Sequence, residues 1–166
     1  KEIATDEQYI LSDTKYEFET AYAGQEIEVI VININDGKPI DNSIKRGRVS
    51  GVKKDENGNA LGGALIGLFK ADTTEYTKEI ALMTATSADD GSFYFENVPY
   101  GNWYVREIAP PTAFVLNEQI FDVKIAENEQ VVEIEIVNEF IRGNIALTKV
   151  DKEYPDNKLT GAEFEV

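Results

Sequence analysis

An internal repeat constrains the fold of this chain more than any other feature of its sequence. Two different segments occur twice, in the same order within the unit: 27–33 matches 132–138, and 47–55 matches 143–151. Both copies of the first segment are rich in valine and isoleucine and end in asparagine. Both copies of the second lead into the sequence Leu-x-Gly-Ala. Two ordered matches of this kind indicate a tandem array of similar domains.

The positions of these matches predict where the domains begin and end. Gly47 and Gly143 start the two copies of one segment, which gives a period of about 96 residues. We expect residues 47–142 to form one complete domain. Residues 1–46 then correspond to the C-terminal part of a preceding repeat plus a linker, and residues 143–166 to the N-terminal strands of a following repeat.

Alternating apolar and polar residues predict β-strands along the unit. Such runs lie at 93–95, 120–125 and 132–137. Turn-forming sequences rich in Gly, Pro, Asn and Asp separate the strands at short intervals, at 55–59, 89–91, 97–101 and 110–111. This pattern is typical of an all-β fold, and we expect an immunoglobulin-like antiparallel β-sandwich.

Composition removes several classes of function. The 166 residues include 16 Lys and Arg against 31 Asp and Glu, and the net charge of −15 disfavours binding to nucleic acid. The absence of cysteine and histidine excludes disulfides and thiol nucleophiles and removes the commonest general base and metal ligand. No apolar run approaches the about 20 residues of a membrane helix, so we expect no membrane span in this fragment. We also expect no metal and no cofactor, because the acidic runs lack the ligand spacing of a calcium-binding loop.

Strand alternation places three polar side chains on faces that otherwise carry apolar residues. Lys53 lies on such a face of the first strand, Glu107 on that of the strand at 103–107, and Asn138 on that of the last strand. We therefore expect all three side chains to point inward. A buried lysine, carboxylate or carboxamide is costly when unpaired, so the three should meet one another or lie where water reaches them.

From the residues alone, two arrangements of these side chains remain open. The first and last strands of such sandwiches often lie side by side, which would bring Lys53 to Asn138 and form a convergent site with Glu107. The second arrangement is an ordinary Lys–Glu ion pair with the asparagine hydrogen-bonded nearby.

Two stretches of the complete unit resemble a known family, the collagen-adhesin B-type (Cna-B) and SpaA-like pilin domains of Gram-positive surface proteins. They are 86–104, TSADDGSFYFENVPYGNWY, and 104–114, YVREIAPPTAF. The second is similar to the family's E-box, Tyr-x-Leu-x-Glu-Thr-x-Ala-Pro-x-Gly-Tyr, with Glu107 and Pro111 at the defining positions. It departs from that sequence at Val105, Ile108, Pro110, Ala113 and Phe114. The resemblance implies a prealbumin-like form of the sandwich.

The resemblance also implies a chemistry for the three inward-facing residues. In such domains the matching lysine and asparagine, here Lys53 and Asn138, join in a spontaneous intramolecular isopeptide bond, with the E-box carboxylate, here Glu107, as catalyst. Burial favours the neutral amine, which can attack, and the protonated acid, which can polarise the carboxamide and shuttle protons as ammonia leaves. Each domain reacts once with itself, so we do not expect an enzyme.

This resemblance implies a structural stalk or spacer of a cell-wall-attached adhesin or pilus-like protein on the outside of a Gram-positive cell. Its partners would be neighbouring repeats of the same protein. An alternative is a module that binds host extracellular matrix or glycan through Tyr100, Trp103 and Tyr104, which we expect to be exposed. A third class, a carboxylate-based hydrolase, requires two facing carboxylates in a cleft, and nothing in the sequence demands one.

The flanking pieces carry partial copies of the reactive residues. Asn33 and Lys149 are equivalent to Asn138 and Lys53, but neither flank contains a second E-box, so we expect no bond to form within them. Residues 154–157, Tyr-Pro-Asp-Asn, are similar to the pilin motif Tyr-Pro-Lys-Asn. An aspartate replaces the lysine that sortase would link, and we expect a turn here.

Overall fold

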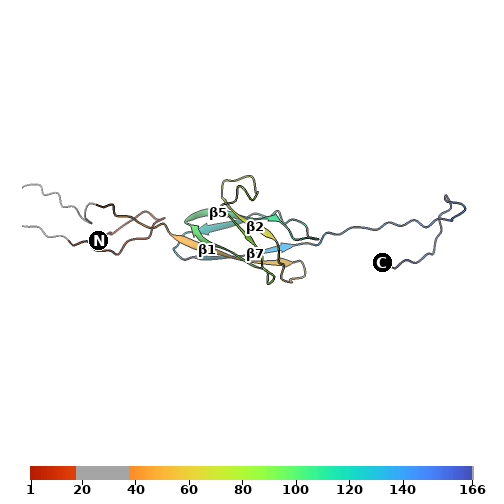
Figure 1. Ribbon diagram of the computed structural model, residues 1–166, viewed down its shortest axis with the longest axis horizontal. Coiled ribbons are helices and arrows are strands. Elements are labelled where there is room, and N and C mark those ends of the chain that lie inside the picture. Colours follow the sequence, from red (N-terminus) through yellow and green to blue (C-terminus); the bar gives the residue numbers. More distant parts are fainter. Residues whose placement is uncertain (18–37, 166) are drawn as a thin grey trace, which may run out of the picture.

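The computed structural model describes residues 1–17 and 38–165, and within these ranges the chain is built from β-strands and loops (Figure 1). The strands are β1 Arg46–Asp55, β2 Leu65–Lys70, β3 Met83–Thr86, β4 Ser92–Pro99, β5 Gly101–Ala109, β6 Phe121–Ile125 and β7 Val131–Asn138. They form a three-stranded sheet in the order β4-β1-β7 and a four-stranded sheet in the order β3-β2-β5-β6. The all-β sandwich predicted from the alternating sequence is confirmed.

Strand β1 lies in the centre of the smaller sheet and pairs with a strand on each side. Its pairing with β4 is antiparallel, whereas its pairing with β7 is parallel, from Arg48 opposite Val131 to Asp55 opposite Asn138. The first and last strands are therefore neighbours, as expected, but they run in the same direction. Parallel neighbours require a long connection, and here the whole of the larger sheet lies between β1 and β7 in the sequence.

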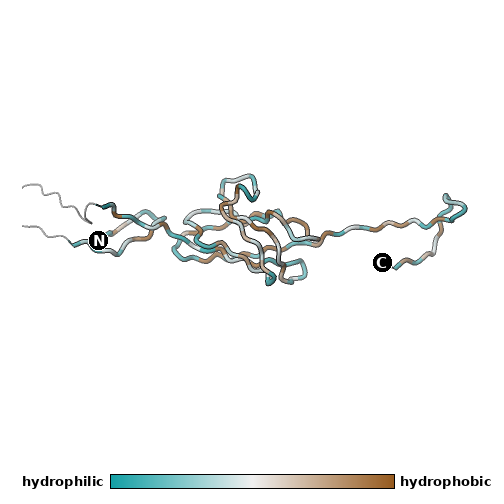
Figure 2. The backbone as a smooth tube through the Cα atoms, viewed as in Figure 1, coloured by the Kyte–Doolittle hydropathy of each residue, from teal (hydrophilic) through white to brown (hydrophobic). Residues whose placement is uncertain are grey.

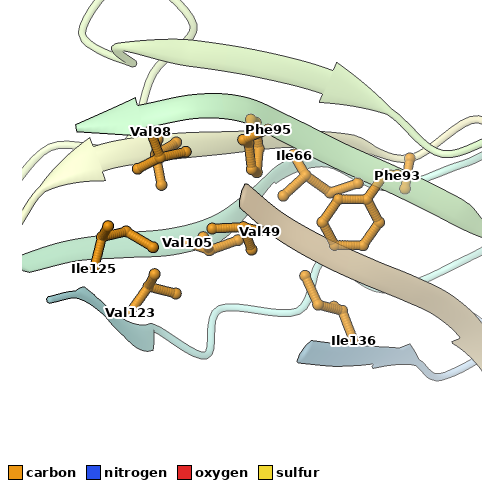
Figure 3. Packing of buried hydrophobic residues seen from close by; sticks show 11 residues of the cluster. Val49, Ile66, Phe93, Phe95, Val98, Val105, Val123, Ile125 and Ile136 are labelled. Atoms are coloured by element: carbon orange, nitrogen blue, oxygen red, sulfur yellow. The ribbon is translucent and has the colours of Figure 1, made fainter. Parts of the chain in front are cut away.

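The two sheets enclose an apolar core formed by alternate residues of the facing strands (Figure 3). Strand β1 shows this alternation clearly, because Val49, Gly51, Lys53 and Asp55 are buried while the residues between them are more exposed. Glycine is needed at position 51, since a Cβ atom there would overlap the ring of Phe93. The buried apolar residues of the core are Val49, Ala64, Ile66, Leu68, Phe93, Phe95, Val98, Val105, Val123, Ile125 and Ile136.

The loop between β2 and β3, which projects from the sandwich in Figure 1, adds a second apolar contact. Phe69 of β2 is fully buried, and the ring of Tyr76 packs against it edge-on with 5.1 Å between centroids. The Arg106 guanidinium lies over the Tyr76 ring at 4.6 Å. Strand β2 is consequently covered on both faces, and its four successive residues 66–69 are all buried.

Two flanking pieces lie outside the sandwich. On the N-terminal side, residues 1–17 run beside 38–45, with a bridge between Tyr9 and Ile44. On the C-terminal side, residues 143–165 extend away from β7 and turn back at a bridge between Val150 and Lys158 (Figure 1). The backbone of this second piece is brown in parts, which marks hydrophobic residues (Figure 2). Its exposed apolar side chains include those of Ile145, Leu147, Val150, Leu159 and Phe164.

Candidate functional site

Three polar side chains end inside the sandwich, between β1, β5 and β7. Lys53 lies near the end of β1, Asn138 is the last residue of β7, and Glu107 lies on β5 in the facing sheet. Lys53 is 0% exposed, and Glu107 and Asn138 are each 1% exposed, which confirms that all three side chains point inward. Lys53 is in register with Ile136, two residues before Asn138, so its long side chain reaches along β7 to the carboxamide.

The three side chains contact one another directly. The Lys53 amine donates to Oδ1 of Asn138 and, at 3.3 Å, to the carbonyl oxygen of Ile136. The Asn138 Nδ2 donates to both carboxyl oxygens of Glu107, at 2.9 Å to Oε1 and 2.8 Å to Oε2. The amine nitrogen and Oε1 of Glu107 are 3.7 Å apart. Amine, carboxamide and acid therefore form a closed triangle, which we call the buried trio.

Burial changes the acid–base behaviour of Lys53. Removal from water lowers the pKa of the Lys53 amine below its ordinary value of 10.5, and attraction to Glu107 opposes this only in part. A larger fraction of this amine is therefore neutral than at a surface lysine at the same pH. A neutral amine has the free electron pair that a nucleophile needs.

The geometry of the buried trio is compatible with two interpretations. In the first, the amine attacks the carboxamide carbon, Cγ of Asn138, which is one bond away from the oxygen that the amine contacts. The Glu107 carboxyl group lies against the nitrogen that would then leave. In the second, the three side chains form a static ion pair bridged by the asparagine, which must offset the cost of removing two charges from water.

A fourth residue, Asn117, reaches Glu107 from the loop between β5 and β6. Its main-chain N–H donates to Oε2 of Glu107 at 2.8 Å, and its side chain donates to the carbonyl oxygen of Val137 at 2.7 Å. Strand parity could not identify this residue, because a loop position has no parity. The available signal is the general preference of asparagine for turns, which many loop residues share.

The chain is also held immediately after Asn138. Residues 113–115 pair with 139–141 through two main-chain hydrogen bonds of 2.8 Å. The rings of Phe114 and Phe140 pack against each other with 4.6 Å between centroids. This pairing continues β7 beyond its last residue and fixes the loop that carries Asn117.

One other residue predicted from the repeat, Lys149, lies apart from the buried trio. Lys149 is exposed in the C-terminal flank, whereas Asn33 lies outside the described residues. The turn predicted at 154–157 is present and is closed by a hydrogen bond of 2.8 Å from the N–H of Asn157 to the carbonyl oxygen of Tyr154.

The prediction that Tyr100, Trp103 and Tyr104 are exposed is wrong. All three are half-buried. Trp103 packs against the core, and its indole N–H donates to the carbonyl oxygen of Pro99 at 2.9 Å. For Trp103 and Tyr104 the physical reason is the position of β5 inside the larger sheet, where β2 and β6 flank it on both sides. Tyr100 lies just before β5, and its hydroxyl group is hydrogen-bonded to Glu7 of the N-terminal flank.

The acidic turns serve the backbone. The Asp55 carboxylate accepts the main-chain N–H groups of Asn57 and Asn59 at 2.9 and 2.8 Å. Within residues 1–17 and 38–165, no group of three or more His, Cys, Asp or Glu side chains could hold a metal ion. The same ranges contain no apolar helix of the length needed to cross a bilayer.

Comparison with known proteins identifies the family of the chain. The profile of the SpaA domain, a prealbumin-like fold domain, matches residues 47–140, which is more than half of the chain. The chain belongs to this family. The matched SpaA domain contains all three members of the buried trio. No curated protein sequence matches the chain.

Solved structures with similar folds include bacterial pilins. The Bacillus anthracis TIE protein is 25% identical with a TM-score of 0.59, over 71% of this chain and 21% of its own. The Bacillus cereus major pilin subunit BcpA is 27% identical with a TM-score of 0.51, over 59% of this chain and 31% of its own. GBS52, the minor pilin of Streptococcus agalactiae, is 15% identical with a TM-score of 0.50, over 65% and 51%, and supports the fold alone. The chain spans less than two thirds of the length of each.

Proposed function

We propose that this chain is a stalk or spacer module of a cell-wall-attached pilus-like protein or adhesin, and that its SpaA domain crosslinks itself. The bond would join Nζ of Lys53 to Cγ of Asn138, with Glu107 as the acid–base catalyst. The observation that carries this proposal is the full burial of an amine in contact with a carboxamide that is itself held by a carboxyl group. The similarity to a pilin subunit supports the structural role and a location outside the cell.

The reaction moves one proton and releases one ammonia. The neutral Lys53 amine attacks Cγ of Asn138, and the electron pair of the carbonyl double bond moves onto Oδ1. Glu107 gives its proton to Nδ2 and takes one from Nζ, so that the acid returns to its starting state. Collapse of the intermediate expels ammonia and leaves an amide between the two side chains. Each domain performs this step once, which is why it is not an enzyme with turnover.

The static ion pair explains the buried trio less well. A charged lysine buried to 0% exposure is stabilised best by direct hydrogen bonds to its counter-ion. Here the amine is 3.7 Å from Glu107 and instead contacts the neutral carboxamide and a main-chain carbonyl. The lowered pKa of Lys53 agrees with a neutral amine in this position.

The crosslink would be useful in an array under tension. It would tie β1 to β7, whose outer ends lead to the neighbouring repeats, so that force could pass through a covalent bond without separating these two strands. An amide of this kind forms without an oxidant, which fits a chain that has no cysteine.

Intact mass spectrometry tests the crosslink directly. We expect the wild-type chain to be lighter than its calculated mass by one ammonia. Glu107→Ala and the nearly isosteric Glu107→Gln should retain the full mass, because both remove the proton relay. Glu118→Gln, which changes a neighbouring carboxylate on the exposed loop, is the matched control and should lose ammonia like the wild type. A wild-type chain of full mass would refute the proposal.

A further inference from the structure

Asn117 is not a member of the buried trio, but it is hydrogen-bonded to Glu107 and to the main chain next to Asn138. It is half-buried in the loop between β5 and β6, ten residues after Glu107. Its main-chain N–H donates to Oε2 of Glu107 at 2.8 Å. Its Nδ2 donates at 2.7 Å to the carbonyl oxygen of Val137, which belongs to the peptide bond leading into Asn138. One loop residue therefore holds both the acid and the backbone of the asparagine.

The orientation of Asn117 is itself fixed. Its Oδ1 accepts the main-chain N–H of Gln119 at 2.8 Å, in a turn typical of asparagine. Both ends of its carboxamide are thus engaged, which sets the direction in which its own N–H points. The pairing of residues 113–115 with 139–141 holds the same loop from its other side.

This N–H distinguishes the two oxygens of Glu107. Nδ2 of Asn138 donates to both oxygens, but Oε2 also accepts the N–H of Asn117, so Oε1 keeps more free acceptor capacity. Oε1 is 3.7 Å from the Lys53 amine and 2.9 Å from Nδ2 of Asn138. Oε1 is therefore the oxygen positioned to take a proton from Nζ of Lys53 and to pass one to Nδ2 of Asn138.

We infer that Asn117 is a positioning residue for self-crosslinking, which turns the Glu107 carboxyl group and fixes the backbone at Asn138 so that Oε1 relays the proton. The inference rests on the proposed isopeptide bond. Asn117 neither gains nor loses an atom: Nζ loses one proton, Nδ2 gains one, and one ammonia leaves. The loop takes no part in the new bond. Its position should still affect the rate, because a displacement of the reacting groups by about 1 Å can slow a reaction about a hundredfold.

The test follows folding and bond formation separately in the whole chain. The chain is made by cell-free synthesis, collected in acidic urea, which keeps it unfolded and its lysines protonated, and then diluted into buffer. Fluorescence of Trp103, the single tryptophan, reports folding. Intact mass reports the loss of one ammonia with time.

Two variants and a matched control isolate the role of the side chain. Asn117→Ala removes both of its hydrogen bonds, whereas Asn117→Asp keeps the acceptor to Gln119 and loses the donor to Val137. Asn128→Ala is the control, because Asn128 is also a loop asparagine whose side chain accepts a main-chain N–H, at 3.2 Å, but it lies beside the start of β1.

We expect Asn117→Ala to fold like the wild type and to form the bond about ten to about a hundred times more slowly. Asn117→Asp should be similarly slow at neutral pH. Its rate relative to the wild type should recover as the pH falls toward about 4, where a protonated aspartate regains a donor. The titratable groups around the loop, Glu107, Glu118, Glu139 and Arg106, are common to both chains and cancel in this ratio.

The outcomes separate this inference from the proposed function. Wild-type rates in both Asn117 variants would overturn the inference and leave the crosslink intact. A wild-type chain that never loses ammonia would overturn both. An equal loss of rate in Asn128→Ala would reveal a general effect of loop changes and would also overturn the inference. If Asn117→Ala fails to fold, the rate and pH dependence of Asn117→Asp decide.

Discussion

Two regions of the chain have similar local hydrogen bonds: the first strand and turn of the SpaA domain, and their second copy in the C-terminal flank. They differ in burial, because the strand lies inside the sandwich and its copy is exposed to solvent. In the domain, the carbonyl oxygen of Lys53 accepts the N–H of Leu61 at 3.0 Å. In the second copy, the carbonyl oxygen of Lys149 accepts the N–H of Leu159 at 2.9 Å. An aspartate two residues after the lysine caps the turn in each copy through its Oδ1 atom.

The burial of the two copies differs completely. Val49 is 0% exposed, whereas Ile145 at the equivalent position is 70% exposed, and Lys149 is exposed where Lys53 is buried. The turn is therefore encoded by its own few residues. Burial, and with it the lowered pKa of Lys53, requires the facing strands that the SpaA domain supplies.

Replacement of the two equivalent lysines should give the largest contrast. Lys53→Met should abolish the loss of ammonia and lower the free energy of unfolding by about 4–5 kcal/mol, the loop-entropy value of a tie across 85 residues. Methionine fills most of the vacated space. Lys149→Met should change neither quantity. Intact mass and urea titration measure both, and equal behaviour of the two variants would break the comparison.

Position 51 should respond next most strongly. Gly51→Ala places a methyl group against the Phe93 ring and should cost about 3 kcal/mol, the upper end for overpacking. The second copy has Leu147 at this position, 61% exposed, and Leu147→Ala should leave the urea midpoint unchanged. A neutral Gly51→Ala would show that the ring can move aside without penalty.

The equivalent apolar residues of the two strands should differ by less. Val49→Ala removes two buried methyl groups and should lower the free energy of unfolding by about 2 kcal/mol. Ile145→Ala, at an exposed site, should stay within about 0.5 kcal/mol of the wild type. Thermal and urea unfolding measure the pair. A similar cost at both positions would mean that the flank is packed against a partner in solution.

The turn aspartates should give the smallest contrast, and it should depend on pH. Hydrogen bonds from the Asn59 side chain and from nearby main-chain N–H groups lower the pKa of Asp55 below its ordinary value of 3.8. The ionised group therefore stabilises the domain above about pH 4, and this contribution disappears as the pH falls through the folded pKa. Asp55→Asn should lower the urea midpoint at neutral pH and converge with the wild type in acid. Asp151→Asn should not affect the midpoint of the domain at either pH.

Strand parity and the repeat predicted much of this molecule. Alternation located β4, β6 and β7, and parity placed Lys53, Glu107 and Asn138 inside before any contact was known. These predictions are correct because a strand with one buried face carries apolar residues at every second position. The chemical role assigned to these residues stays a prediction until the mass is measured.

The remaining features depend on contacts that no local pattern records. Parity could not give the parallel direction of β7, which is set by the path of the chain through the other sheet. The exposure expected of Trp103 and Tyr104 for a binding module was wrong because β2 and β6 flank their strand on both sides, and that of Tyr100 because its side chain contacts the N-terminal flank. Asn117 could not be predicted for a related reason, because its hydrogen-bond partners depend on how the loop between β5 and β6 folds over β7.

The parallel course of β1 and β7 also determines how much length each repeat would add to an array. The chain enters the sandwich at one end and leaves it at the other (Figure 1). The 8 residues of β7 span about 26 Å at about 3.3 Å per residue. Each successive repeat would therefore lengthen the array by a distance of this order, while most residues of the repeat would add to the width of the array. Reach from the cell surface would grow with the number of repeats, and an antiparallel last strand would instead have returned the chain to its starting point.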